Sequence, residues 1–306
     1  MSQPRSIVPG ATYLVTRRTL LRHMLFRPDA EITRLIVYSL SVSARRFGIQ
    51  VHALCAMSTH VHLVLTDVHG LLPKFLHLFH RLVALGTKVL RSWEGPVWDH
   101  EATSAVHLLT RQAMVERIAY TLANPVAAGL VRHAHEWPGA TVLVDEIGRG
   151  TLRATRPDVY FDAGNSQWPQ EERLLLTLPP CIGAGDAAEF RHDVAAELAR
   201  EEARAHETLK RRGVAIVGSK RAVIVSPRAR ATSIEELRGR NPMFAVGRGN
   251  GDMLKRAVAA LRAFRSSYRE ALAVWRTGVR RVVFPAGTWW MRVLHAVAVS
   301  SGAPAL

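Results

Sequence analysis

The alternation of apolar and polar residues over positions 12–130 predicts strands separated by amphipathic helices. Apolar residues two positions apart indicate a strand, and apolar residues three or four apart indicate a helix. Strands are expected at 12–18, 49–57 and 60–67 and within 95–109, and helices within 26–48, 69–93 and 110–130. The resulting order β-α-β-β-α-β-α predicts an α/β (α+β) fold with ferredoxin-like topology and an antiparallel central sheet.

Capping residues mark the expected ends of two of these helices. Asp29 and Thr110 are suitable N-caps, and Gly48 is a suitable end for the first helix. The third helix is expected to end at Asn124-Pro125, because the residue before a proline is pushed out of the helical region.

The second half of the chain gives a weaker pattern. It predicts a charged helix at 189–213, a hairpin at 214–225 that turns at Gly218-Ser219, and a long helix at 251–278. On the long helix we expect a buried stripe made of Leu254, Val258, Leu261, Tyr268, Leu272 and Trp275. Turn residues between 137 and 170 suggest a boundary, so we expect one domain at 1–145 and a basic, mixed but mainly helical extension at 146–306.

One predicted strand carries two histidines inside an apolar run, AMSTHVHLVL at 56–65. Side chains alternate faces along a strand, so His60 and His62 share one face while Val61, Leu63 and Leu65 point into the core. Two imidazoles aimed at one point from a rigid strand suit a metal ion, although two ligands alone are too few. The alternative is a pair of structural or surface histidines.

The missing ligand and a nucleophile both occur in the third helix. Tyr120 and Asn124 are four residues apart and therefore share a helix face. If that face packs on the histidine strand, a phenol and an amide oxygen join the imidazoles. Such a site suits Mg²⁺ or Mn²⁺ bound to a phosphodiester, which the tyrosine could attack. Asp99, His100 and Glu101 are alternative ligands, or simply solvated loop residues.

These two segments resemble the single-tyrosine HUH transposases, in particular the REP-associated tyrosine transposases. That family has an MPNHVHLL-type strand and a helix ending in Y-x-x-x-NP-x-RAGLV, and this chain has MSTHVHLVL and YTLANPVAAGLV. The resemblance covers residues 11–139. It implies an HUH nuclease domain in which His60, His62 and Asn124 bind the metal and Tyr120 is the nucleophile. It also implies cleavage of single-stranded DNA beside a hairpin, through a 5′-phosphotyrosine intermediate that can be resealed to another end.

The composition also indicates that the protein binds a polyanion. The formal net charge of +16 favours nucleic acid, while 48% hydrophobic residues indicate a folded chain. The residues that we expect to contact DNA are basic residues close to the predicted site or clustered in the second half: Arg17, Arg18, Lys210, Arg211, Arg212, Lys220 and Arg221. The long helix and the residues just after it also carry arginines that either form a solvated face or contact phosphates: Arg262, Arg265, Arg269, Arg276 and Arg280. We expect Trp289 and Trp290 to pack in a core rather than to stack on bases.

The cysteine content and the apolar segments of the sequence predict where in the cell the protein is found. Two cysteines exclude a disulfide framework and a thiolate zinc site, and neither a signal peptide nor a membrane-spanning segment is evident. We therefore expect a cytoplasmic, nucleoid-associated monomer or homodimer that mediates DNA transposition or recombination. The alternatives are a domesticated DNA-binding protein that does not cleave and an RNA-binding regulator.

Overall fold

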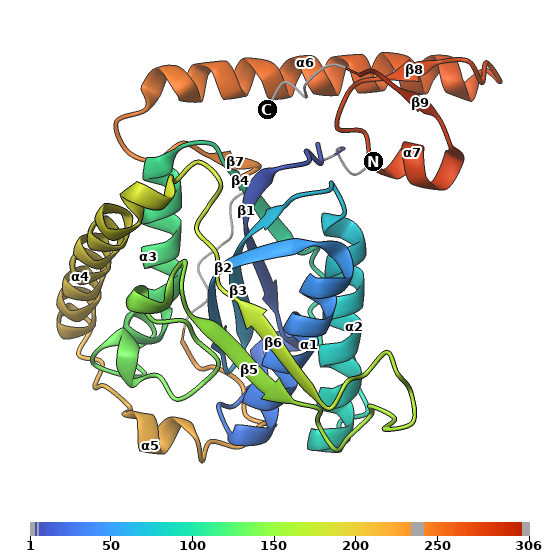
Figure 1. Ribbon diagram of the computed structural model, residues 1–306. Helices are drawn as coiled ribbons and strands as arrows, with labels where there is room; N and C mark the ends of the chain where they lie inside the picture. The colour runs from blue at the N-terminus through green and yellow to red at the C-terminus, as the bar shows by residue number, and fades with distance from the viewer. Residues whose placement is uncertain (1–3, 5, 234–241, 302–306) are drawn as a thin grey trace.

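A five-stranded sheet forms the centre of the protein, with helices on both faces (Figure 1). The structure is a computed structural model and describes residues 4, 6–233 and 242–301. The strand order is β2-β3-β1-β4-β7. Helices α1 and α2 pack against each other on one face, and α3 covers the other face with α4 outside it (Figure 1).

The first four strands are antiparallel and follow the predicted positions. Their bounds are Ala11–Arg18 for β1, Ile49–Met57 for β2, His60–Asp67 for β3 and Ser104–Leu108 for β4. The register sets Thr16 of β1 opposite His62, and Arg18 opposite His60. The observed order β-α-β-β-α-β-α and the strand order β2-β3-β1-β4 confirm the predicted ferredoxin-like topology.

Two of the predicted caps start helices as expected. The bounds are Ala30–Phe47 for α1, Leu72–Arg91 for α2 and Arg111–Ala127 for α3. The Asp29 carboxylate accepts a hydrogen bond from the backbone N–H of Ile32 at 3.0 Å, and the Thr110 hydroxyl accepts one from Ala113 at 3.1 Å. Gly48 ends α1 in the left-handed conformation, with φ of 65°.

The end predicted for α3 is wrong, because the helix continues past Pro125 to Ala127. Proline removes one backbone donor, but the last turn is closed by other bonds: the N–H of Ala128 donates to the Asn124 carbonyl at 3.0 Å, and that of Leu130 to the Pro125 carbonyl at 2.9 Å. These bonds offset the loss of the proline donor. The continuous helix keeps Asn124 on the same face as Tyr120.

The second half of the chain packs onto the first at several places. Its bounds are Thr151–Thr155 for β5, Glu171–Leu175 for β6, Ala187–Arg211 for α4, Ser219–Ala222 for α5, Phe244–Ala245 for β7, Gly251–Arg276 for α6, Val283–Phe284 for β8, Trp290–His295 for α7 and Ala298–Val299 for β9. Short 3-10 turns lie at Leu20–Arg22, Ala134–Glu136, Val144–Glu146 and Ala184–Asp186. Strand β7 joins the central sheet parallel to β4, and one core cluster contains residues from both sides of the predicted 145/146 boundary. The division into two domains stays a prediction.

The hairpin expected in this half is wrong. Residues 214–225 do not pair with one another as a hairpin: Val217 and Gly218 donate their N–H groups to the carbonyls of Gly129 and Leu130, and the single turn α5 follows. The antiparallel pair β5–β6, which the sequence did not reveal, packs on α1 instead.

Helix α6 follows the predicted bounds but not the predicted stripe. Its buried residues are Ala257, Phe264 and Ala271, a spacing of seven, whereas Leu254 is 47% exposed. The remaining stripe residues are half-buried. Trp290 is 61% exposed, so its predicted packing in a core is wrong as well. None of the described helices is both long and apolar enough to cross a bilayer.

A buried chain of polar side chains holds β2, β3 and the segment after β6 together. His52 lies at a β-bulge, where its Nδ1 donates to the Thr177 carbonyl at 2.8 Å and its Nε2 accepts from the Thr66 hydroxyl at 2.8 Å. Thr66 in turn bonds the hydroxyl of Thr12 at 2.7 Å. Complete burial lowers the pKa of His52 to about 4, against a smaller raising effect of the Thr177 hydrogen bond.

This shift predicts a pH-dependent stability. Because the unfolded chain binds a proton on His52 near pH 6.5 and the folded protein only near pH 4, the free energy of unfolding should fall as the pH drops from 6.5 to 4. His52 alone should contribute about 3 kcal/mol to that fall, and His52→Gln should flatten the profile by a similar amount. Urea denaturation at a series of pH values measures the effect. A variant profile parallel to that of the wild type would contradict it.

Candidate active site

The two histidines of β3 form one pair at the start of the strand. His60 and His62 lie on the same face of the sheet, with ring centroids 4.6 Å apart and ring planes at 84°. His60 is half-buried, and its Nδ1 lies 2.9 Å from the Thr59 hydroxyl. The strand thus presents two imidazoles side by side, as the alternation of faces predicted.

His62 is buried and is held by a neighbour on β1. Its Nδ1 lies 2.9 Å from the Thr16 hydroxyl, while its buried Nε2 has no hydrogen-bond partner among the described residues. Burial, followed by the charges of His60 and Arg18, lowers the pKa of His62 well below 6.5. Asn124 has a smaller raising effect on this pKa, although its geometry falls short of a hydrogen bond to Nε2. A neutral ring with an unpartnered buried nitrogen is suited to bind a metal.

Helix α3 places Tyr120 next to the His62 ring. The rings of Tyr120 and His62 are 5.6 Å apart between centroids and nearly perpendicular, at 88°. Tyr120 is nevertheless 40% exposed, and the guanidinium of Arg117, one turn earlier, lies 6.0 Å from its ring centroid. The tyrosine is therefore next to the histidine pair and still accessible to a substrate.

Asn124 follows Tyr120 by one turn on α3. Its amide nitrogen donates to the Tyr120 carbonyl at 2.7 Å. Since the nitrogen is engaged in that bond, the amide oxygen is the atom left for a ligand. The structure brings together the four residues that the sequence selected: His60, His62, Tyr120 and Asn124.

A cavity of about 200 Å³ opens in front of Tyr120 and His62. Arg17 and Arg18, both predicted to contact DNA, line it together with Asp99 and Glu101. Arg17 donates to the Thr103 hydroxyl at 2.9 Å and to the Asp99 carbonyl at 3.2 Å, so its guanidinium is fixed at the wall. Three arginines, Arg17, Arg18 and Arg117, and two carboxylates thus line the cavity beside the tyrosine.

The donor set fits a divalent ion with open positions. Two imidazole nitrogens and an amide oxygen suit Mn²⁺ better than Mg²⁺, which prefers oxygen ligands. Within the described residues, no group of three or more His, Cys, Asp or Glu side chains is placed to hold a metal. Asp99 and Glu101 therefore line the cavity without completing such a group, and Asp99 instead accepts the backbone N–H of Glu101 at 3.0 Å.

The remaining residues predicted to contact DNA lie away from this cavity. They are Lys210 and Arg211 at the end of α4, Arg212 just after it, and Lys220 and Arg221 in α5, and all five are exposed. The hydrogen bonds of Val217 and Gly218 to Gly129 and Leu130 hold this cluster near the end of α3. DNA binding by these residues stays a prediction.

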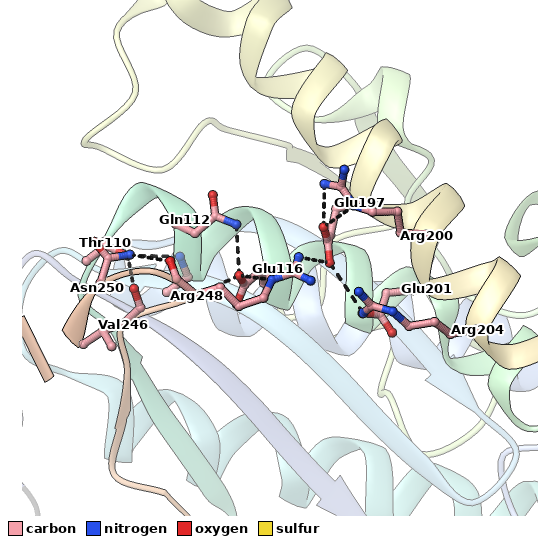
Figure 2. Close-up of polar contacts among 11 residues, drawn as sticks. Thr110, Gln112, Glu116, Glu197, Arg200, Glu201, Arg204, Val246, Arg248 and Asn250 are labelled. Carbon is pink, nitrogen blue, oxygen red and sulfur yellow. Dashed lines mark hydrogen bonds and ion pairs between the residues drawn. The ribbon is translucent and has the colours of Figure 1, made fainter. Parts of the chain in front are cut away.

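An ion-pair network fixes α3 and was not found from the sequence (Figure 2). Arg248 donates from its backbone N–H and its Nε to Glu116 of α3, at 2.9 and 3.0 Å, and also pairs with Glu197 of α4. Glu197 is 1% exposed and is also bound by Arg200 at 2.6 Å. Burial by itself would raise the pKa of Glu197, but hydrogen bonds from Arg200 and Arg248 lower it below its ordinary value. Glu116 lies one turn before Tyr120, so the network braces the tyrosine helix.

Solved structures similar to this chain include two that are described as transposases. The chain is similar to a REP-associated tyrosine transposase. That structure, described as bound to a REP hairpin, matches at 14% identity and a TM-score of 0.41, over 55% of this chain and 97% of the other. A candidate transposase from Deinococcus radiodurans R1 matches at 19% identity and a TM-score of 0.28, over 36% of this chain and 86% of the other. No family model and no curated protein matches the sequence.

The hydrogen bond between His62 Nδ1 and the Thr16 hydroxyl predicts a role for Thr16 in metal binding. Thr16→Val removes the hydroxyl that orients His62, so Mn²⁺ binding should weaken about 10- to 100-fold. Thr16→Ser keeps the hydroxyl and should bind as the wild type does. Calorimetric titration with Mn²⁺ at neutral pH measures both constants. Equal affinities for the Val and Ser variants would show that Thr16 has no such role.

The Arg248 network predicts a loss of stability on substitution. Arg248→Met leaves the buried carboxylate of Glu197 with fewer partners and should lower the free energy of unfolding by about 2 kcal/mol. The matched control is Arg173→Met, which breaks an ion pair whose two side chains are 60% and 45% exposed, and which should cost at most about 0.5 kcal/mol. Urea denaturation at pH 7 compares them. Similar losses in the two variants would contradict a bracing role for Arg248.

Proposed function

We propose that this protein is a metal-dependent single-stranded DNA endonuclease and strand transferase that uses Tyr120 as its nucleophile. One observation carries the proposal: an accessible tyrosine stands beside a buried neutral histidine whose Nε2 has no partner among the described residues. Ordinary core packing satisfies buried polar atoms. The unpartnered nitrogen instead suits an additional ligand.

His60, His62 and Asn124 would hold Mg²⁺ or Mn²⁺. Such an ion would polarise the scissile phosphodiester and stabilise the charge that develops during the reaction. Thr16 orients the His62 ring through Nδ1, which leaves Nε2 to face the ion.

Tyr120 performs the covalent step. Its hydroxyl oxygen forms a bond to phosphorus while the bond from phosphorus to the 3′ oxygen breaks, and the phenolic proton leaves as the 3′ oxygen becomes a hydroxyl. A 5′-phosphotyrosine link results, and attack by another 3′ hydroxyl reverses it and joins a new end. Arg17, Arg18 and Arg117 line the cavity and attract the phosphates on either side of the cleaved bond.

The proposed substrate is a single strand beside a hairpin. The paired sequence motifs MSTHVHLVL and YTLANPVAAGLV favour this substrate. Tyr120 and His62 meet within one chain, so a monomer is sufficient to form the site. Whether the protein works as a monomer or a homodimer, and its place in the cytoplasm beside the nucleoid, stay predictions.

A covalent-adduct assay tests the proposal. Hairpin-bearing single strands incubated with the protein and Mn²⁺ should form a protein–DNA adduct that survives denaturing gel electrophoresis. EDTA, Tyr120→Phe or His62→Ala should abolish it, because each removes a component of the covalent step.

Tyr160→Phe is the matched control, because Tyr160 is also 40% exposed but does not line the cavity. It should form adduct at the rate of the wild type. Undiminished adduct with Tyr120→Phe would contradict the proposal. Tight hairpin binding without any adduct, over a broad pool of oligonucleotides, would favour a DNA-binding protein that does not cleave.

A further inference from the structure

Three arginines form a row along one flank of α6. Arg262, Arg265 and Arg269 are three and four residues apart, which is the spacing of side chains that share a helix face. Together with Pro4 they line a hollow of about 180 Å³. Arg262 and Arg269 are exposed, and Arg265 is half-buried. The hollow is thus lined by three arginine side chains and Pro4, mostly through the apolar atoms of their stems.

No carboxylate neutralises this row within the part of the chain that the structure describes. None of the three arginines forms an ion pair there, whereas Lys255 on the same helix lies 3.3 Å from the Asp252 carboxylate. The Nε of Arg265 is buried without a hydrogen-bond partner among the described residues. Arg269 donates its own Nε to the Arg265 carbonyl at 3.2 Å, which fixes its stem along the helix. Buried donors are normally satisfied, so the unpaired Nε calls for an acceptor.

We propose that Arg262, Arg265 and Arg269 bind the phosphate backbone of a DNA duplex, as a second DNA site separate from the Tyr120 cavity. We identify this duplex as the stem of the hairpin, and that identification rests on the proposed function. Phosphate oxygens supply the negative charge that no described carboxylate brings to this row.

The shape of the row favours a duplex over an unpaired strand. An α-helix rises 1.5 Å per residue, so the row extends about 10 Å, and a duplex places one phosphate of each strand every 3.4 Å along its axis. Unpaired strands are usually held by aromatic side chains that stack on the bases. The aromatic residues of α6 are not available for this: Phe264 is 5% exposed, Tyr268 is half-buried, and Arg280 lies 4.3 Å above the Trp275 ring.

The position of α6 allows both sites to contact one hairpin. The helix lies across the end of the sheet where β1 begins (Figure 1), and its Leu261 shares a small cavity with Ile7 and Tyr13. The Tyr120 cavity is lined by Thr16, Arg17 and Arg18 at the other end of β1. At 3.3 Å per residue, β1 spans about 23 Å, which corresponds to about seven base pairs of duplex. A short stem is therefore long enough to reach from one site to the other.

The test compares two triple variants that lose the same charge. The first is Arg262→Gln/Arg265→Gln/Arg269→Gln. The second is Arg149→Gln/Arg173→Gln/Arg256→Gln, in which Arg149 and Arg173 form exposed ion pairs and Arg256 lies on the opposite face of α6 from Arg265. Fluorescence anisotropy measures the dissociation constant of each protein for a hairpin with a 12-base-pair stem, for the same loop without a stem, and for phosphatidylserine vesicles. Thermal melting followed by circular dichroism confirms that both variants are folded.

The α6 variant should bind the hairpin at least about tenfold more weakly at 0.1 M salt, and the slope of log K against log salt should fall by about 2.7, or 0.9 for each lost contact. The stemless strand should bind as before, and the control variant should retain the wild-type slope. Equal losses in the two variants, an unchanged slope, or a loss confined to the vesicles would overturn the proposal.

The adduct assay separates this proposal from the proposed function. At saturating DNA, the α6 variant should still form the Tyr120 adduct, and Tyr120→Phe should still bind the stem with the wild-type salt slope. Stem binding that depends on the α6 row, in a protein that forms no adduct under any condition, would support the second site and contradict only the proposed chemistry.

Discussion

The contact between α3 and β3 is the constraint on which the proposed chemistry depends. Tyr120 and His62 come from elements that are distant in sequence, and only the packing of α3 on the sheet brings their rings to 5.6 Å. The Thr110 hydroxyl starts this helix and also donates to the Val246 carbonyl, while Glu116 binds Arg248. The position of the tyrosine is therefore set by the second half of the chain as well as by the sheet. A rigid helix is needed because covalent catalysis tolerates little displacement of the nucleophile.

Two buried histidines of the same sheet show how a structural role can be separated from a functional one. Burial lowers the pKa of both His52 and His62. His52 uses both ring nitrogens in hydrogen bonds and so completes a polar chain between strands. His62 uses only Nδ1, and its Nε2 is unpartnered among the described residues beside an accessible tyrosine. The burial is similar, and the difference in satisfied nitrogens is what favours the proposed ligand role for His62 over a structural one.

The sequence predicted the elements whose apolar periodicity is local, and it missed the contacts that depend on distant partners. Strands β1 to β3, helices α1 to α3 and the shared face of His60 and His62 follow directly from alternation and capping. Pro125 was a misleading signal, because bonds from Ala128 and Leu130 close the last turn of α3 around it. Residues 214–225 have the alternation of a hairpin but bond to the segment after α3 instead. Thr16 and Arg248 have no local signature, since their importance arises only when β1 meets β3 and when α3 meets α4.

The distribution of charge explains why so basic a chain can fold around an ion-pair network. Where the second half packs on the first, arginines are matched by carboxylates: Arg248 with Glu116 and Glu197, and Arg111 with Glu189 and Asp193. The pairs of Glu197 offset the desolvation of its buried carboxylate. Further positive charge lies at the surface, on the row of α6 and on the cluster at the ends of α4 and α5, where Arg211 pairs with Glu207 at 3.9 Å. Exposed positive charges repel one another and weaken the fold unless a polyanion covers them, so the net charge of +16 itself favours a phosphate-bearing partner that spans more than the Tyr120 cavity.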